Sequence, residues 1–422
     1  MIACYLPTDK DVVNMMMTCR HFRQTLSPPN SGIWRSMFLD EYDPPPPDKS
    51  SLEIKWEYQF RSIILRKHVS FAKGEKARET LWLQCISTLI NESFTYFPED
   101  DFEWGRPSAN IPVIEKALQD SEFLHRPVVG YNLQKTFKPS SSFLGIQICL
   151  TYLAVRLDRP FRALREDYDI GIAYGVGQNI GKSLLKGENL DLEQFLHIRN
   201  FWKRHLTSRE EYTFHSSYKC ISPGSRPKPW DVNFERRLDV MSNWTGYYSC
   251  IHPYVGMDDL IERQSCADFA THWDKIPQVY LHLTCASIDS RWPKVFEGVF
   301  PYLASVTPEN RLWFSGSQWI DGDDYDYWVT GFLEYLPERQ GGFPDFQRIC
   351  FVIFDFSEAG EDEVRGVPFS EKWDLTEWGH YFEWAIGYEG LLLPAGRIMM
   401  GRWRDLLSEE WDGGPFIFWE TY

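Results

Sequence analysis

The hydrophobic pattern of the chain begins with a helical period. From Asp9 onward the apolar residues fall on one face of a helix, at Val12, Met15, Met16, Cys19, Phe22 and Leu26. This spacing of three or four residues is that of an amphipathic helix, and Thr8 is a good N-cap for it. A proline break follows, and then a second short helix whose inner side we predict to carry Ile33, Trp34, Met37 and Phe38. Residues 1–42 therefore predict a small helical module.

A longer helical region follows this module. Residues 43–51 contain four consecutive prolines and predict a stiff, solvated spacer. The helical period returns at Leu52, with Trp56, Phe60 and Ile63/Ile64 on one stripe. Similar amphipathic segments are expected at Glu75–Phe94, Ile111–Leu124, Phe143–Leu157 and Leu192–Leu206. Residues 52–221 are therefore predicted to be mainly helical.

Beyond the linker-like segment Ser222–Pro229 the period changes from that of a helix to that of a strand. Segments rich in β-branched and aromatic residues predict strands at Trp244–Ile251, Val279–Cys285, Tyr327–Tyr335, Ile349–Phe356, Trp378–Tyr388, Arg397–Trp403 and Pro415–Trp419. Residues 230–422 thus predict an antiparallel β-barrel-like domain or a sandwich. A closed barrel is favoured because closure removes exposed edges. The predicted fold class is α+β.

Composition and charge narrow the functional classes. The formal net charge of −16 argues against binding the phosphates of a nucleic acid. The nine cysteines are scattered without a CxxC pair, which argues against a disulfide framework and favours a reducing compartment. The longest apolar segment, Leu144–Val155, is too short to span a bilayer, and no secretory leader precedes Pro7. We expect a cytoplasmic or nuclear protein with no nucleic-acid and no membrane partner.

The N-terminal pattern resembles a known interaction module. A short helix, the run Cys19-Arg20-x-Phe22-Arg23, a Pro-containing loop and then Trp34-Arg35 are similar to the latter two-thirds of an F-box. In that family a helix opened by Leu-Pro comes first, and Met1–Tyr5 matches only its tail. The resemblance implies docking onto the Skp-type adaptor of cullin–RING ubiquitin ligases. The implied adaptor-binding face comprises Leu6, Pro7, Val12, Met15, Met16, Cys19 and Trp34.

The C-terminal part resembles the same group of proteins. Leu393–Trp403 and Gly414–Trp419 look like the tail of fungal F-box proteins, and Trp244–Tyr248 followed by Arg263–Asp268 resembles their barrel region. At fold level the arrangement is similar to animal F-box proteins with a degron-binding C-terminal β-barrel. The resemblance implies a substrate-receptor subunit of an SCF-type (Skp–cullin–F-box) ubiquitin ligase. Candidate target-binding aromatics are Trp313, Trp328 and Trp403, for which packing in the barrel is the alternative.

No nucleotide or calcium motif is complete in the sequence. The glycine-rich segment Gly175–Ser183 misses the glycine spacing of a phosphate loop by one residue, so we predict a tight turn there. The acidic segment Asp321–Asp326 lacks the ligand spacing of an EF-hand, so we predict a solvated hairpin. We therefore expect no cofactor.

Metal and catalytic sites are also not indicated. The nearest histidine and cysteine groups are His252 with Cys250 and Cys266, and His282 with Cys285, and neither has four ligands at zinc spacing. We expect a protein that binds rather than an enzyme. Two alternatives stay open. One is a β-barrel that binds or hydrolyses a small apolar ligand and carries a remnant F-box. The other is an inactive relative whose helical module docks nothing.

Overall fold

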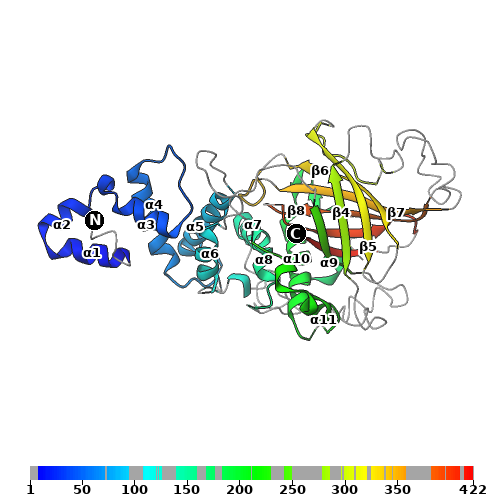
Figure 1. The fold of residues 1–422 in the computed structure, drawn as a ribbon, viewed down its shortest axis with the longest axis horizontal. Helices are drawn as coiled ribbons and strands as arrows, with labels where there is room; N and C mark the ends of the chain where they lie inside the picture. Colours follow the sequence, from blue (N-terminus) through cyan, green and yellow to red (C-terminus); the bar gives the residue numbers. More distant parts are fainter. Residues whose placement is uncertain are drawn as a thin grey trace. The chain divides into compact units, whose positions relative to one another are not determined.

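The computed structural model describes residues 8–71, 74–94, 108–119, 121, 123–125, 139–158, 168–175, 183–210, 212–229, 242–249, 278–285, 296, 299–307, 310–320, 325–336, 339–344, 346–357, 382–394, 396–408 and 413–421. The chain divides into two compact units. Unit 1 comprises residues 1–123 with 229–235, and unit 2 comprises residues 124–228 with 236–422. Figure 1 shows helices in the blue, N-terminal part of the chain and strands in the yellow-to-red, C-terminal part.

Unit 1 is built from helices. Its elements are α1 (Asp9–Thr18), α2 (Arg20–Leu26), the 3-10 turn η2 (Pro29–Ser31), α3 (Ile33–Glu41), α4 (Ser51–Leu65), α5 (Ala77–Ser93) and α6 (Asn110–Gln119). The boundary between the units in the sequence falls within a further 3-10 turn, η3 (Phe123–His125), after its first residue. The helices predicted at Leu52 and at Glu75–Phe94 are therefore confirmed.

The first predicted helix is in fact two helices. Cys19 is extended, with φ −155°, and separates α1 from α2. The Thr18 hydroxyl donates to the Met15 carbonyl at 2.7 Å, and such a bond competes with continuation of the helix. The expectation of one continuous helix was wrong for this reason. The predicted N-cap is confirmed, since the Thr8 hydroxyl accepts the Asp11 N–H at 3.2 Å.

Part of the core of unit 1 lies between α3 and α4. As predicted, the inner side of α3 buries Ile33, Trp34, Met37 and Phe38. The Trp34 ring lies 6.2 Å from the Tyr58 ring of α4, and its Nε1–H donates to the Leu26 carbonyl at 3.1 Å. Arg61 is also buried here and forms an ion pair with Glu92 at 2.6 Å. A buried cation of this kind requires such a partner.

The Pro-rich segment between α3 and α4 is tied to unit 1 at its first residue. Asp43 is buried, and its N–H donates to the Asn110 side chain at 3.1 Å. Its carboxylate accepts the Ala109 N–H at 2.7 Å and the Ser108 hydroxyl. The start of the predicted spacer is therefore packed rather than solvated.

Unit 2 begins with helices and a small hairpin. These elements are α7 (Ser141–Cys149), α8 (Thr151–Ala154), α9 (Ile170–Tyr174), β1 (Leu185–Lys186), β2 (Asn189–Leu190), α10 (Leu192–Thr207), α11 (Tyr212–Cys220) and the turn η6 (Pro223–Ser225). Asp191 caps α10 by accepting the Gln194 N–H. α9 and α10 pack against the barrel that follows (Figure 1).

The strands of unit 2 close into an antiparallel barrel, which confirms the predicted barrel. They are β3 (Ser242–Tyr248), β4 (Val279–Cys285), β5 (Leu312–Ile320), β6 (Tyr327–Tyr335), β7 (Gln347–Phe356), β8 (Phe382–Leu392), β9 (Ile398–Asp405) and β10 (Gly413–Thr421). Each strand pairs with the next one along the chain, and β10 closes the barrel on β3. No described strand edge of this sheet is left open.

The barrel interior is filled with large apolar side chains. Phe351 of β7 stacks on Tyr388 of β8 with ring centroids 4.5 Å apart, and both belong to the buried core cluster. Close strand contact requires glycine at Gly316 of β5, because a Cβ there would lie 1.8 Å from the His282 carbonyl oxygen.

The outer side of the barrel holds a buried charge network. Arg348 donates to Glu334 at 3.1 Å and to Glu389 at 2.7 Å, and Arg311 donates to Glu334 at 2.7 Å. Glu334 also accepts the Leu303 N–H at 3.3 Å. The network thus fastens the segment around Leu303 to the outer face of β6 and β7.

The sequence also predicted cysteines without a disulfide framework and no segment long enough to span a bilayer. The cysteines within the described ranges are free thiols, with Cys85, Cys149 and Cys350 buried and Cys19, Cys220 and Cys285 exposed. Among the described helices, none combines the length and the apolar character needed to cross a lipid bilayer.

Candidate functional site

The residues of the expected adaptor-binding face divide into two groups. Leu6 and Pro7 lie outside the described residues. Val12 and Trp34 are buried in unit 1, whereas Met15 and Met16 are half-buried and Cys19 is exposed. The structure therefore places Val12 and Trp34 beneath the surface, where they support the helices rather than face solvent.

Another part of α1 forms an exposed apolar face. Met17 is 80% exposed, Val13 is also exposed, and Met16 is half-buried. Met16 and Met17 lie three and four residues after Val13, so all three side chains lie on one side of the helix. We call Val13, Met16 and Met17 the α1 face. Met16 was among the predicted site residues, whereas Val13 and Met17 were not, because the predicted apolar stripe runs through Val12, Met15, Met16 and Cys19.

The stripe predicted on α4 is also exposed. The core side of α4 carries Ile54, Tyr58, Arg61 and Ser62. The exposed side carries a second set of large apolar residues, which we call the α4 stripe: Leu52, Trp56, Phe60 and Ile63. Trp56 alone is 61% exposed. The sequence located this stripe correctly but gave no sign that it faces away from the core.

The three candidate target-binding tryptophans do not gather at one place. Trp403 is buried inside the barrel and donates its Nε1–H to the Ser249 carbonyl at 2.9 Å. Trp313 is half-buried on the outer side, with its ring 5.5 Å from that of Phe332. Trp328 is exposed on the outer side. The structure thus does not bring them together as one binding surface.

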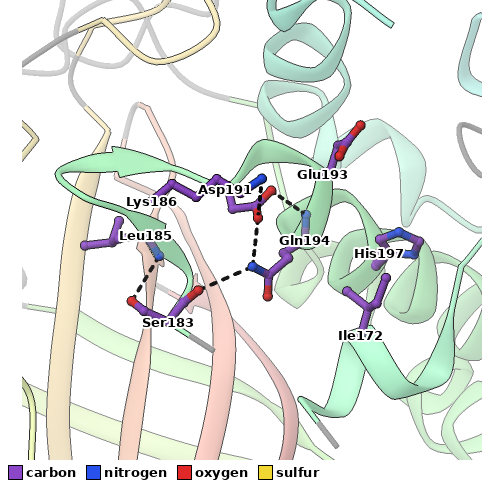
Figure 2. Close-up of a pocket in the computed structure, with 8 residues that line it drawn as sticks. All are labelled: Ile172, Ser183, Leu185, Lys186, Asp191, Glu193, Gln194 and His197. Carbon is purple, nitrogen blue, oxygen red and sulfur yellow. Dashed lines mark hydrogen bonds and ion pairs between the residues drawn. The ribbon is translucent and has the colours of Figure 1, made fainter. Parts of the chain in front are cut away.

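A pocket in unit 2 was not anticipated from the sequence. It has a volume of about 410 Å³ and is lined by Ile172, Ser183, Leu185, Lys186, Asp191, Glu193, Gln194 and His197. These residues come from α9, the β1–β2 hairpin with the residues before it, and the first two turns of α10. Figure 2 shows His197 beside Ile172, and Asp191, Gln194 and Ser183 linked by hydrogen bonds. We call this the α10 pocket.

One side of the α10 pocket is held by a chain of hydrogen bonds. The Gln194 amide donates to the Asp191 carboxylate at 2.8 Å and to the Ser183 carbonyl at 3.3 Å. Its oxygen accepts from the buried Arg402 guanidinium of β9 at 2.8 Å. Lys186 forms an ion pair with Asp191 at 2.8 Å. These contacts fix the orientation of Gln194 and leave Asp191 paired.

The opposite side of the pocket carries a buried histidine. His197 is 3% exposed, and its Nδ1 accepts the Asp169 N–H at 2.9 Å. Burial, together with the nearby Arg402 charge, lowers the pKa of His197 to about 4. The ring is therefore neutral at physiological pH and carries its proton on Nε2.

Of the glycine-rich segment Gly175–Ser183, the structure describes the two ends, and Ser183 lines this pocket. Gly175 ends α9 with φ 71°, a left-handed C-cap, while residues 176–182 lie outside the described residues. Asp191 already occupies the N-cap of α10 and Glu193 lies in its first turn, so a phosphate at this helix end would meet two carboxylates.

The histidine and acidic groups weighed from the sequence give no metal centre within the described part of the chain, where no group of three metal-ligating side chains occurs. His282 bonds Asn243 at 2.9 Å. His252, Cys250 and Cys266 lie outside the described residues, as do positions 321–324 of the acidic segment.

Comparisons with known proteins add nothing to the resemblance seen in the sequence. The chain matches no protein-family model, no curated protein and no solved structure.

Proposed function

We propose that this chain is a substrate-receptor subunit of an SCF-type ubiquitin ligase. Unit 1 binds the Skp-type adaptor and unit 2 captures a target protein. Such a receptor performs no bond chemistry, because it acts by raising the effective concentration of the target near the ubiquitin-charged enzyme. The observation that carries the proposal is the exposed α1 face within the segment that resembles an F-box.

The α1 face suits a protein partner. A short helix normally turns its large apolar side chains toward the core, and a cluster left in water marks an interaction site. Met17 is 80% exposed, whereas Val12 of the same helix is buried. Methionine side chains adapt to the shape of a partner surface. Full burial of one such side chain contributes about 1.5–3 kcal/mol.

The proposal modifies the expected adaptor-binding face. Met15, Met16 and Cys19 remain candidates for direct contact, together with Val13 and Met17. Val12 and Trp34 act from beneath by holding α1 and α3 in place. Substitution of those two residues would test folding rather than adaptor binding.

Co-purification with the Skp-type adaptor tests the proposal. The full chain and the variants Val13→Glu and Met17→Glu are co-expressed with the adaptor and their affinities are measured. Loss of one buried apolar contact predicts a fall of about tenfold to a hundredfold in affinity. The matched control is Leu81→Glu on α5, which changes an exposed apolar residue of the same unit outside the α1 face. Equal adaptor retention by all three variants, or none by the unaltered chain, would refute the proposal.

A second candidate function is favoured by one residue of the barrel. Gln318 of β5 is 4% exposed, and its Oε1 has no hydrogen-bond partner. By strand register Gln318 points inward, because it pairs with Leu281 and Tyr327 of the interior core. A buried amide oxygen without a partner is costly, and a small ligand with a donor group would satisfy it.

Under this alternative the barrel binds a small, mainly apolar ligand and the helical module is a remnant. Native mass spectrometry of the full chain would show a stoichiometric small molecule, and Gln318→Leu would lose it. A protein of unliganded mass that retains the adaptor would exclude this alternative.

A further inference from the structure

A buried lining residue of the α10 pocket, His197, offers a hydrogen-bond donor. The Nδ1 of His197 is already used by Asp169, and among the described residues no group forms a hydrogen bond with Nε2. His197 lines the pocket although its side chain is only 3% exposed. A neutral Nε2–H can donate to an acceptor such as a carbonyl oxygen.

The charges around the pocket disfavour both kinds of ion. Apart from the Lys186–Asp191 pair, an anion would meet the carboxylate of Glu193, and a cation would meet the Arg402 guanidinium that donates to Gln194. Hydrogen bonds from Lys186 and Gln194 outweigh the opposing effect of burial and hold the pKa of Asp191 below its usual value. The Lys186–Asp191 pair therefore stays charged and neutralises itself.

The remaining groups match an amide. His197 supplies an N–H for the ligand carbonyl, and exposed Glu193 at the rim supplies an acceptor for a ligand N–H. Ile172 and Leu185 give the pocket apolar walls for an aliphatic chain. Its volume of about 410 Å³ lies within the range of small-ligand sites, roughly 300–1,000 Å³. Gln194 is held by its own bonds, so the site is largely preformed.

We propose that the α10 pocket is a recognition site for an uncharged amide side chain, that of Gln or Asn, in a target polypeptide. The aliphatic part of that side chain lies between Ile172 and Leu185, its carbonyl accepts from His197, and its NH₂ donates to Glu193. This inference rests on the proposed receptor function. It places the target-binding site at the α10 pocket and not at Trp313, Trp328 and Trp403.

Histidine-selective NMR of the full chain tests the site directly. The probe is N-acetyl-L-glutamine N-methylamide, and the comparison probes carry glutamate or lysine in place of glutamine. The expected result is a saturable shift of the His197 resonance with the glutamine probe and binding about tenfold weaker for either charged probe. Equal or tighter binding of a charged probe, or no shift of His197 with any probe, would overturn the assignment.

Two variants separate the site from the fold. His197→Asn keeps an acceptor at the Nδ1 position for the Asp169 N–H but removes the donor into the pocket. Leu185→Trp fills the pocket from the hairpin and leaves His197 as a reporter. Isothermal titration calorimetry measures probe binding to both variants, because His197→Asn has no His197 resonance. Both are expected to weaken glutamine-probe binding about tenfold or more while the barrel spectrum is unchanged. Unchanged binding in Leu185→Trp would place the amide elsewhere.

Free L-glutamine distinguishes a peptide ligand from a small metabolite. Tighter binding of the free amino acid than of the capped probe would overturn the target-polypeptide assignment. Adaptor affinity, measured on the same variants, separates the two proposals. If the glutamine probe binds but the adaptor does not, the ligase proposal fails and the amide site stands. If the adaptor binds but His197 does not respond, only the amide site fails.

Discussion

Exposed large apolar side chains are distributed unequally over the two units. Among the described residues, unit 1 exposes Val13, Met17, Leu39, Leu52, Trp56, Phe60, Ile63 and Leu81, whereas unit 2 exposes Tyr325 and Trp328. The barrel can turn inward-facing residues into a closed core and cover part of its outer face with helices. In unit 1, α1 and α4 each bury one side and leave apolar residues on the other side exposed.

Under the proposed function, this difference suggests which surface of each unit would bind a partner. Unit 1 presents apolar surface on α1 and α4, which suits a broad protein interface. Unit 2 presents a small preformed pocket with defined hydrogen-bonding groups, which suits recognition of a single side chain. Substitutions at buried positions should therefore lower the free energy of unfolding, whereas substitutions at exposed positions should leave it nearly unchanged.

The largest expected effect is in the barrel core. Phe351→Ala removes a fully buried ring that stacks on Tyr388 at 4.5 Å. We expect unit 2 to lose about 3–5 kcal/mol of its free energy of unfolding, because the substitution leaves a cavity. Hydrogen exchange read by mass spectrometry follows peptides of each unit separately. Trp328→Ala, on the exposed outer side, is the matched control and is expected to change little.

An equal loss of protection from hydrogen exchange in unit 1 of Phe351→Ala would contradict the difference between the two units. That result would mean that the two units unfold as one cooperative body. Protection lost only in peptides of β6, β7 and β8 would instead localise the effect further, to one side of the barrel.

The next effect in size depends on pH and on His197. Burial and the Arg402 charge lower its folded-state pKa to about 4, against about 6.5 for an unperturbed histidine. Between these values the unfolded chain binds a proton that the folded chain does not, so stability of unit 2 falls as pH falls from about 6.5 to about 4. The total contribution is at most about 3.4 kcal/mol.

Urea titrations at a series of pH values measure this dependence. The His197→Asn variant cannot take up the proton, so its stability should vary less than that of the unaltered chain across the same pH interval. Identical slopes for the two proteins would show that His197 does not titrate in this way, and would remove the argument that its ring stays neutral in the pocket.

The sequence predicted the barrel better than it predicted the details of single strands. The bounds of β4 and β6 are those expected from their dense β-branched and aromatic residues. The strand β5 was missed, because Ser315, Gly316 and Gln318 dilute its apolar pattern. The need for glycine at position 316 appears only when β4 and β5 are paired, since it arises from the His282 carbonyl.

The α10 pocket was not accessible to sequence reasoning for a similar reason. Its residues come from α9, a two-residue hairpin strand and α10, and no spacing along the chain links them. One signal was present, since Asp191 followed by Gln194 has the pattern of a helix N-cap with a polar residue at N3. It locates the start of α10, but it does not show that Arg402 of β9 orients Gln194.

The smallest expected effect is on the α4 stripe of unit 1. Trp56 is 61% exposed and Trp34 is 1% exposed, so the two tryptophans differ mainly in burial. We expect Trp56→Ala to change the free energy of unfolding by no more than about 0.5 kcal/mol. The matched variant Trp34→Ala should cost about 3–5 kcal/mol, because it empties a core site and removes the bond to the Leu26 carbonyl.

Hydrogen exchange of α3 and α4 peptides measures both variants under the same conditions. A large loss of protection in Trp56→Ala would mean that the α4 stripe is covered by the chain itself, and the contrast between exposed helices and closed barrel would then fail. If stability is retained but adaptor affinity falls, the α4 stripe extends the α1 face. If both are retained, the adaptor contact is confined to α1, because Trp56 would have been the largest exposed contributor on α4.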